Sequence, residues 1–153
     1  MFIKSIFAGI LLMFSTLCYS EEFIIHADDK QLIVSTEELS QMMVTHYVTA
    51  LPWTNGREIF SGVLFETLFE HYDLPLPETV GLIALNDYRT TISREDILKY
   101  QPIIAFQRNG EPMSVRNKGP FWVIFSLEIY PELDNINYHS KMIWQLTQIY
   151  DQF

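Results

Sequence analysis

Cysteine is almost absent from this 153-residue chain, in which Cys18 is the only one. Residues 19–153 therefore offer no disulfide bond, no thiolate nucleophile and no thiolate ligand for a metal. The stability of the fold must come from burial of apolar side chains, for which 48% of the residues are apolar and 14% aromatic.

Basic side chains are also scarce, with 10 Lys and Arg against 19 Asp and Glu, so the formal net charge is −9. Removal of residues 1–20 takes away Lys4 and no acid, which moves this charge from −9 to −10. Such acidity argues against nucleic acid and against an anionic membrane surface as partners, because both repel a negative protein. It leaves a small neutral ligand open.

Long apolar runs are missing as well, since the longest is residues 6–17 near the N-terminus. With Lys4 before this run and Ser20 after it, the pattern predicts a secretory signal peptide over residues 1–20. A membrane anchor is a weaker alternative, because a bilayer span needs roughly 20 apolar residues. Lipidation at Cys18 is another alternative, but Leu17 is bulky where lipoprotein signals carry a small residue.

The common catalytic motifs are not found. The sequence has no Gly-x-Ser-x-Gly elbow, no Walker loop, no Gly-x-Gly-x-x-Gly and no His-Glu-x-x-His. The histidines share no spacing typical of a metal site, and we interpret them as surface residues of strands or loops: His26, His46, His71 and His139. No catalytic residue and no metal ligand is predicted.

The chain is rich in short β-prone segments and poor in helices. We expect strands at residues 23–26, 31–34, 44–50, 80–85, 88–92, 102–107, 112–115, 121–125 and 142–150. We expect helices at residues 37–43, 64–72 and 94–99, the first and third capped by Ser35 and Ser93, and a loop at residues 130–140. Residues 21–153 are thus predicted to form one mixed, strand-rich α+β domain, since helices do not alternate regularly with strands.

Polar residues gather where the predicted strands end. Asn86-Asp87-Tyr88-Arg89 separates two apolar strands, and Arg116-Asn117-Lys118-Gly119-Pro120 precedes another. Loops at strand ends often build binding sites, but the same residue types also form ordinary turns. The tryptophans are ambiguous in the same way: Trp53 lies in a loop, whereas Trp122 and Trp144 lie in apolar strands and are more typical of a core.

Four segments in series resemble a known family. They are Phe60-x-Gly62-x-Leu64, Ala84-Leu85-Asn86-Asp87-Tyr88, Asn109-Gly110-Glu111-Pro112-Met113 after Ile103-Ile104-Ala105-Phe106, and Lys118-Gly119-Pro120-Phe121-Trp122. Over residues 44–150 this pattern resembles the molybdopterin-binding domain of sulfite-oxidase-like oxidoreductases, which implies their mixed, strand-rich fold. Those enzymes hold molybdenum through a cysteine before the Phe-x-Gly-x-Leu segment. This chain has none there, so the resemblance implies no redox activity.

The chain is most similar to a smaller group of exported proteins that lack this cysteine. The shared segments are Thr49-Ala50-Leu51-Pro52-Trp53-Thr54-Asn55-Gly56, Asn86-Asp87-Tyr88 and Arg116-Asn117-Lys118-Gly119-Pro120-Phe121-Trp122. This resemblance implies a non-catalytic, periplasmic pterin-binding protein. It further implies a partner, the periplasmic domain of an inner-membrane diguanylate cyclase or phosphodiesterase of cyclic-di-GMP signalling.

A pterin is flat and has a polar edge, so a binder needs an aromatic face together with hydrogen-bonding groups. We expect Trp53 to stack on the ring, Tyr88 to form a second wall and Asp87 to accept from the ring amine. Donors are expected from Arg116, Lys118 and the Gly119 N–H. The full predicted ligand-binding set is Trp53, Asn86, Asp87, Tyr88, Arg116, Lys118, Gly119 and Trp122.

Because Arg116 and Lys118 are the only obvious bases for a phosphate, the sequence favours an unphosphorylated pterin over molybdopterin. No catalytic cofactor is expected. Two alternatives remain open. One is a small periplasmic molybdopterin-dependent oxidoreductase with a non-cysteine metal ligand, and the other is an exported interaction module whose pocket binds nothing.

Overall fold

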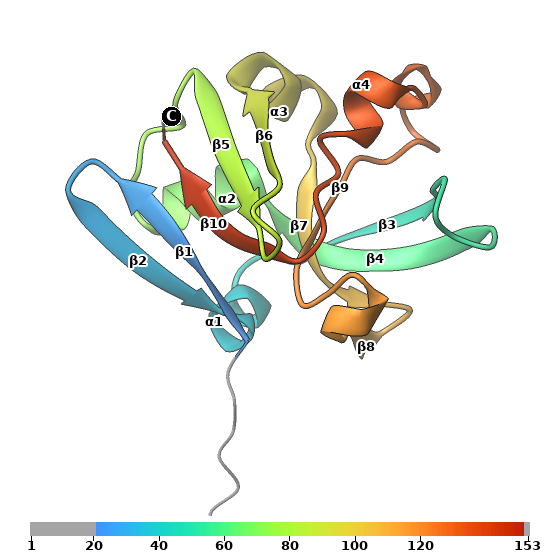
Figure 1. Cartoon of the computed structure of the whole chain (residues 1–153), viewed down its shortest axis with the longest axis horizontal. Helices are drawn as coiled ribbons and strands as arrows, with labels where there is room; N and C mark the ends of the chain where they lie inside the picture. Colours follow the sequence, from blue (N-terminus) through green and yellow to red (C-terminus); the bar gives the residue numbers. More distant parts are fainter. Residues whose placement is uncertain (1–20, 152–153) are drawn as a thin grey trace, which may run out of the picture.

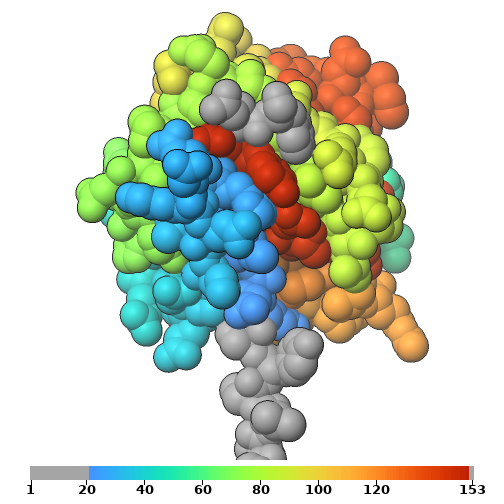
Figure 2. Space-filling model, turned by 60° about the vertical axis from the view of Figure 1, so that its left-hand side comes forward, coloured from blue at the N-terminus to red at the C-terminus, as the bar shows by residue number. Residues whose placement is uncertain are grey.

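A computed structural model describes residues 21–151, and the predicted signal peptide lies outside this range (Figure 1). One sheet has the strand order β2 (Lys30–Ser35), β1 (Glu22–Ala27), β10 (Leu146–Tyr150), β5 (Thr79–Ala84) and β6 (Arg89–Ser93). Strands β1 and β10 pair in parallel, and the other neighbours are antiparallel. Figure 2 shows β10 at the surface between β1 and the β5–β6 hairpin. Strand β10 thus lies between the β1–β2 hairpin and the β5–β6 hairpin and pairs with both.

A second sheet has the order β3 (Thr45–Ala50), β4 (Arg57–Leu64), β7 (Ile103–Arg108) and β8 (Glu111–Pro112), and β9 (Trp122–Ile124) also pairs with β7. All these pairings are antiparallel. Asn109 and Gly110 both have positive φ between β7 and β8, which is the geometry that the Asn-Gly pair predicts for a two-residue hairpin turn.

The helices are short: α1 (Thr36–Gln41), α2 (Phe65–His71), α3 (Arg94–Tyr100) and α4 (Ile136–His139), with 3-10 turns η1 (Val115–Asn117) and η2 (Pro131–Leu133). Ser35 and Glu38 form the predicted capping box, and Ser93 accepts a hydrogen bond from the Asp96 N–H. None of the helices in residues 21–151 combines the length and the apolar content that a bilayer crossing requires.

The two sheets share one hydrophobic core. Its largest fully buried side chains include Trp122, Phe60, Phe121 and Phe125, and Phe60 packs edge-on against Trp122 with ring centroids 5.3 Å apart. Mixed strands with a few short helices confirm the predicted strand-rich α+β class.

Three local predictions are wrong. The strand expected at residues 112–115 is only the two-residue β8, and Val115 begins η1. No strand was predicted between residue 50 and the helix expected at residues 64–72, yet β4 runs over Arg57–Leu64. Gly62 lies at a register shift in β4, where an added Cβ would lie 2.2 Å from the Ile104 carbonyl oxygen of β7. This close backbone approach requires glycine, and a glycine inside a strand obscures the strand's signal in the sequence.

The third wrong prediction concerns the C-terminal part. Residues 130–140, expected to be a loop, contain η2 and α4, and β10 begins at Leu146 instead of Met142. Residues 142–144 instead run antiparallel beside β9, where the Val123 N–H donates to the Ile143 carbonyl and Trp144 forms a bridge with Trp122. Tertiary contacts with β9, which the local sequence does not encode, fix this path.

Candidate functional site

A cavity of about 340 Å³ lies where three segments meet. The loop after β3 contributes Trp53, the β5–β6 turn contributes Asn86 and Tyr88, and the segment from α4 towards β10 contributes most of the remaining wall. The other lining residues are Ala84, Ile136, His139, Ser140, Met142, Ile143 and Trp144. These segments are distant in sequence, and the two-sheet fold brings them together.

Aromatic rings form much of the cavity wall. The Trp53 ring is 5.3 Å from the Trp144 ring at 75°, and 5.7 Å from the His139 ring at 68°. Trp122 supports both tryptophans from the core, with centroids 6.1 Å from Trp53 and 6.3 Å from Trp144. The indole of Trp122 is fixed in turn, since its Nε1–H donates to the Met142 carbonyl at 3.1 Å. Trp122 therefore fixes the positions of Trp53 and Trp144 at the cavity.

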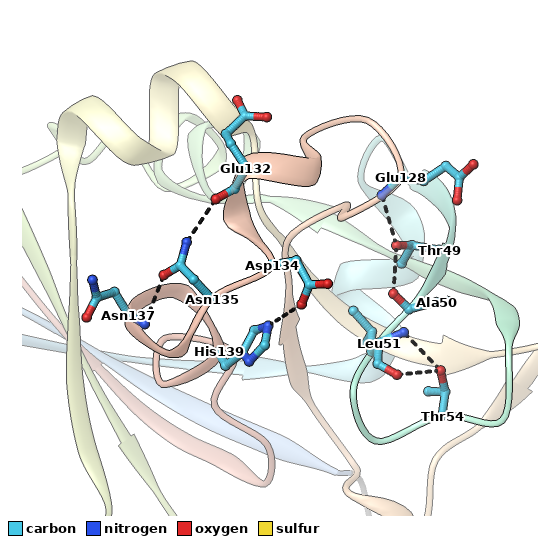
Figure 3. A network of polar contacts seen from close by, with 10 residues as sticks. All are labelled: Thr49, Ala50, Leu51, Thr54, Glu128, Glu132, Asp134, Asn135, Asn137 and His139. Carbon is cyan, nitrogen blue, oxygen red and sulfur yellow. Dashed lines mark hydrogen bonds and ion pairs between the residues drawn. The ribbon is translucent and has the colours of Figure 1, made fainter.

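The loop that carries Trp53 is closed by the side chain of Thr54. The Leu51 N–H donates to the Thr54 hydroxyl oxygen at 2.9 Å, and that hydroxyl lies 2.8 Å from the Gly56 carbonyl, to which it donates (Figure 3 shows the Leu51–Thr54 contacts). These bonds replace the sheet pairing that ends at Ala50. They fix the conformation of the loop that carries Trp53.

The β5–β6 turn is tied to the opposite wall. The Tyr88 N–H donates to the Asn86 side-chain oxygen at 3.2 Å, and the Tyr88 hydroxyl donates to the Ser140 carbonyl at 2.8 Å. The Asn86 amide nitrogen makes no hydrogen bond to residues 21–151 and can donate to a ligand.

The third wall is α4 and its flanks. Asn135 caps this helix by accepting from the Asn137 N–H at 3.0 Å, and its own amide donates to the Glu132 carbonyl at 2.8 Å. His139 Nε2 lies 2.8 Å from an Asp134 carboxylate oxygen (Figure 3). This contact orients the imidazole, which packs against the Trp53 ring. Local polar bonds thus shape a helix of a single turn.

Asp96 at the start of α3 anchors this wall to the body of the protein. Its carboxylate accepts from the Tyr138 hydroxyl at 2.9 Å and from the Lys141 ammonium. Burial raises the pKa of Asp96, but the hydrogen bonds from Lys141 and Tyr138 outweigh burial and hold that pKa below its ordinary value. Burial, followed by the bond to Asp96, raises the pKa of Tyr138. The residues on either side of His139 are therefore pinned to α3.

The structure brings three of the sequence-predicted residues, Trp53, Asn86 and Tyr88, to the cavity. Asp87 does not line it. It lies at the exposed tip of the β5–β6 turn with φ of 64°, in the left-handed conformation that Asp adopts readily in turns. The conformation of the turn therefore explains why the sequence has Asp at position 87.

The two predicted bases occupy different positions. Arg116 is exposed on η1 and does not line the cavity. Lys118 Nζ lies 3.8 Å from the centroid of the Trp144 ring, so its ammonium covers that indole. Burial and then the charge of Arg108 lower the pKa of Lys118. Lys118 reaches the site through Trp144 and is not itself part of the lining.

Gly119 and Trp122 differ from their predicted roles. The Gly119 N–H, expected to bond a ligand, already donates to the Ser114 carbonyl at 2.9 Å. An added Cβ would lie 1.9 Å from the Met113 carbonyl oxygen, so glycine is required for packing. Trp122 is fully buried, because its ring is enclosed by other aromatic side chains. It packs against Trp144 from the core and does not line the cavity.

Sequence reasoning missed Trp144, His139 and Ser140. Trp144 was assigned to a core strand and His139 to the surface, yet both line the cavity. Their segment carries no motif, and only its contacts with Trp53, Tyr88 and β9 place it there.

Neither a protein-family model nor a curated protein matches the sequence. Among solved structures, the fold is similar to the sulfane dehydrogenase SoxCD from Paracoccus pantotrophus, with a TM-score of 0.59 and 13% identity over 84% of this chain. The similarity covers 37% of that longer chain. At this identity it establishes the fold alone, which is the sulfite-oxidase-like fold that the sequence predicted.

The side chains do not fit a molybdenum centre of the cysteine-ligated kind. Residues 52–56, which precede Phe60 and Gly62, contain no cysteine, and the same is true of all residues from 21 to 151. Within that range no three His, Asp or Glu side chains are grouped so that they could hold a metal ion. The cavity offers aromatic faces and amide or hydroxyl groups, which suit an organic ring.

Proposed function

We propose that this protein binds a pterin in the cavity and does not catalyse a redox reaction. The observation that carries the proposal is the meeting of Trp53, Tyr88 and Trp144 around one cavity of about 340 Å³. A fused bicyclic ring needs apolar faces to stack on and a volume at the lower end of small-molecule pockets, roughly 300–1,000 Å³.

Groups that match a pterin edge lie on two facing walls of the cavity, one in the β5–β6 turn and one after α4. The Asn86 amide nitrogen is available to donate to a ring carbonyl or ring nitrogen. The Ser140 hydroxyl donates to the Asn137 carbonyl at 2.8 Å, which leaves its oxygen able to accept from a ring amine. Ser140 thereby replaces Asp87 as the acceptor in the proposal.

The charge of the lining supports an unphosphorylated ligand. None of the lining residues is Lys, Arg, Asp or Glu, and Arg116 and Lys118 lie outside the lining. A phosphate would need a dedicated basic site inside the cavity, because its desolvation is costly.

The proposal also concerns where the protein acts and which partner it has. We infer that the protein acts in the periplasm after removal of residues 1–20 and that its ligand state is reported to an inner-membrane enzyme of cyclic-di-GMP turnover. The support is the apolar N-terminal run after Lys4, together with the resemblance carried by the Trp53, Asn86-Asp87-Tyr88 and Lys118-Gly119-Pro120 segments.

Native mass spectrometry of the protein purified from the periplasm tests ligand identity. The expected result is one bound pterin without phosphate or metal. Stoichiometric molybdenum would favour the oxidoreductase alternative, and a protein that carries no ligand and binds no added pterin would overturn the proposal.

Calorimetry with unsubstituted and phosphorylated pterins then tests the site. Loss of a stacked aromatic face costs about 1–3 kcal/mol, so Trp53→Ala should weaken binding roughly 5- to 150-fold. Trp53→Phe is the matched control, because it keeps a ring in the same position. Unfolding midpoints of both variants separate lost affinity from lost folding.

A further inference from the structure

His139 is the residue of the cavity lining whose side chain titrates near neutral pH, since imidazoles ordinarily change charge between pH 5 and 8. The rest of the lining holds no Lys, Arg, Asp, Glu or Cys. The side chain of His139 is only 18% exposed, and its ring packs edge-on against Trp53 with centroids 5.7 Å apart. The charge of the cavity wall near neutral pH therefore depends on one imidazole.

Asp134 fixes where this imidazole carries a proton. The Nε2 atom of His139 lies 2.8 Å from an Asp134 carboxylate oxygen (Figure 3). A carboxylate accepts hydrogen bonds and donates none, so Nε2 carries the hydrogen of this contact in the neutral ring and in the protonated ring alike. The proton that His139 gains or loses is therefore the one on Nδ1.

The Nδ1 atom of His139 makes no hydrogen bond to any group in residues 21–151. It is an acceptor in the neutral ring and a donor in the protonated ring. A ligand that fills the cavity displaces water from the imidazole, and a polar atom that loses water without gaining a partner destabilises the complex. A ligand N–H would satisfy the neutral ring, whereas the protonated ring would repel it.

The charged groups around His139 leave this role to its own ring. Residues 51–57, 85–89 and 132–144 contribute to the cavity or its flanks, and none of their charged side chains lines it: Arg57, Asp87, Arg89, Glu132, Asp134 and Lys141. Arg57 pairs with Glu128 and Lys141 with Asp96, and Lys118 lies over Trp144. Of the charged groups in residues 21–151, Asp134 alone bonds to the imidazole.

We propose that neutral His139, held in its Nε2–H form by Asp134, accepts a ligand N–H at Nδ1, and that protonation of His139 releases the ligand. The aminopyrimidinone edge of a pterin presents a ring N–H beside an exocyclic amine, so it needs two acceptors. His139 supplies one, and the adjacent Ser140 hydroxyl supplies the other. This inference deepens the proposed function and rests on it.

The two residues have different roles in this proposal. His139 is a specificity-determining residue, because it selects a ligand edge that donates. Asp134 is a positioning residue that acts through His139. The cavity then holds its ligand at neutral pH and empties in acid.

Calorimetry with an unsubstituted pterin between about pH 5 and pH 7.5 is the first test. The affinity of the parent should fall at least about fivefold towards the acid end. His139→Gln keeps an amide that can reach Asp134 but cannot take up the proton, so its affinity should not depend on pH. At neutral pH it should bind roughly 2- to 10-fold more weakly than the parent, since one hydrogen bond is lost.

His46→Gln is the matched control. His46 is an exposed histidine outside the lining whose Nδ1 lies 2.8 Å from the Ser61 hydroxyl, so this variant should keep the pH profile of the parent. Unfolding midpoints of both variants separate lost affinity from lost folding.

Three results overturn the proposal. His139→Gln could bind as tightly as the parent at neutral pH. It could lose affinity in acid as the parent does, which would assign the titration to the ligand. The affinity of the parent could rise in acid, which would make Nδ1 a donor. A parent that binds no pterin at any pH refutes the proposed function, and this inference with it.

Nitrogen NMR of the imidazoles tests the role of Asp134 without a ligand. Neutral His139 should carry its hydrogen on Nε2 in the parent and in Asp134→Glu, which keeps a carboxylate. Asp134→Asn should give a mixture of both tautomers, because an amide can either accept from the ring or donate to it. Added pterin should shift the Nδ1 signal of the parent. A neutral ring with its hydrogen on Nδ1, or an Nδ1 signal unchanged by bound pterin, overturns the proposal.

Discussion

The hydroxyl of Tyr88 donates a hydrogen bond to the main-chain carbonyl of Ser140, 2.8 Å away. This bond ties the β5–β6 turn to the residue after α4, so it closes the cavity between two walls that are 52 positions apart in the sequence. The shape of the site therefore depends on a tertiary contact between two exposed residues.

Tyr88→Phe removes this bond and keeps the ring. A single hydrogen bond of this kind contributes about 0.5–1.5 kcal/mol, so pterin affinity should fall roughly 2- to 10-fold. Tyr88→Ala also removes the aromatic wall and should cost more. Calorimetry on both variants measures the difference, and equal affinities for the two would contradict a role for the ring.

Asp96→Asn should destabilise the protein and loosen the α4 wall, because Asp96 accepts from Tyr138 and Lys141. Hydrogen bonds to a charged group contribute about 1.5–3 kcal/mol. Denaturant unfolding at pH 7 measures the loss. Glu132→Gln is a control, because Glu132 is exposed and its side chain forms no ion pair within residues 21–151.

The pH dependence of stability follows from the same carboxylate. Because the folded state lowers the pKa of Asp96, its stabilisation is complete above the ordinary value near 3.8 and is lost as pH falls through the folded-state pKa. The free energy of unfolding should therefore drop below about pH 4, and less so in Asp96→Asn. Identical acid profiles of the two proteins would show that Asp96 is not ionised in the fold.

Substitution of Trp144 should mainly weaken ligand binding, whereas substitution of Trp122 should mainly lower the free energy of unfolding. Trp144→Leu removes a cavity face and should weaken pterin binding by about 1–3 kcal/mol with a smaller effect on folding. Trp122→Leu opens a void in the core and should cost about 3 kcal/mol of unfolding free energy. Calorimetry and denaturant unfolding on both variants test this contrast, which fails if Trp122→Leu is as stable as the parent.

Gly119→Ala should destabilise the corner before β9, because its Cβ would lie 1.9 Å from the Met113 carbonyl oxygen. Overpacking of this kind costs about 1–3 kcal/mol or more. Thermal unfolding measures the loss, and Asn117→Ala at an exposed neighbouring position is the control. A midpoint equal to the parent's would mean that the Met113 backbone shifts easily.

Several elements were predictable because their signals are local. The capping box of Ser35 and Glu38 needs only residues three positions apart, and the Asn109-Gly110 turn needs only two residues that tolerate positive φ. The turn that carries Asn86 and Tyr88 was predictable for the same reason, since a polar break between two apolar strands marks it.

The tertiary structure alone decided which of these residues share a site. Asp87 and Tyr88 are adjacent in sequence, but the left-handed conformation of Asp87 leaves it at the turn tip while Tyr88 reaches Ser140. Trp144 and Trp122 lie in similar apolar segments, yet Trp122 is fully buried among other aromatic rings whereas Trp144 lines the cavity. The sequence by itself determined the fold class, the missing thiolate and the local caps and turns. The cavity was decided by packing between distant segments, because side-chain exposure depends on neighbours that only the folded chain brings together.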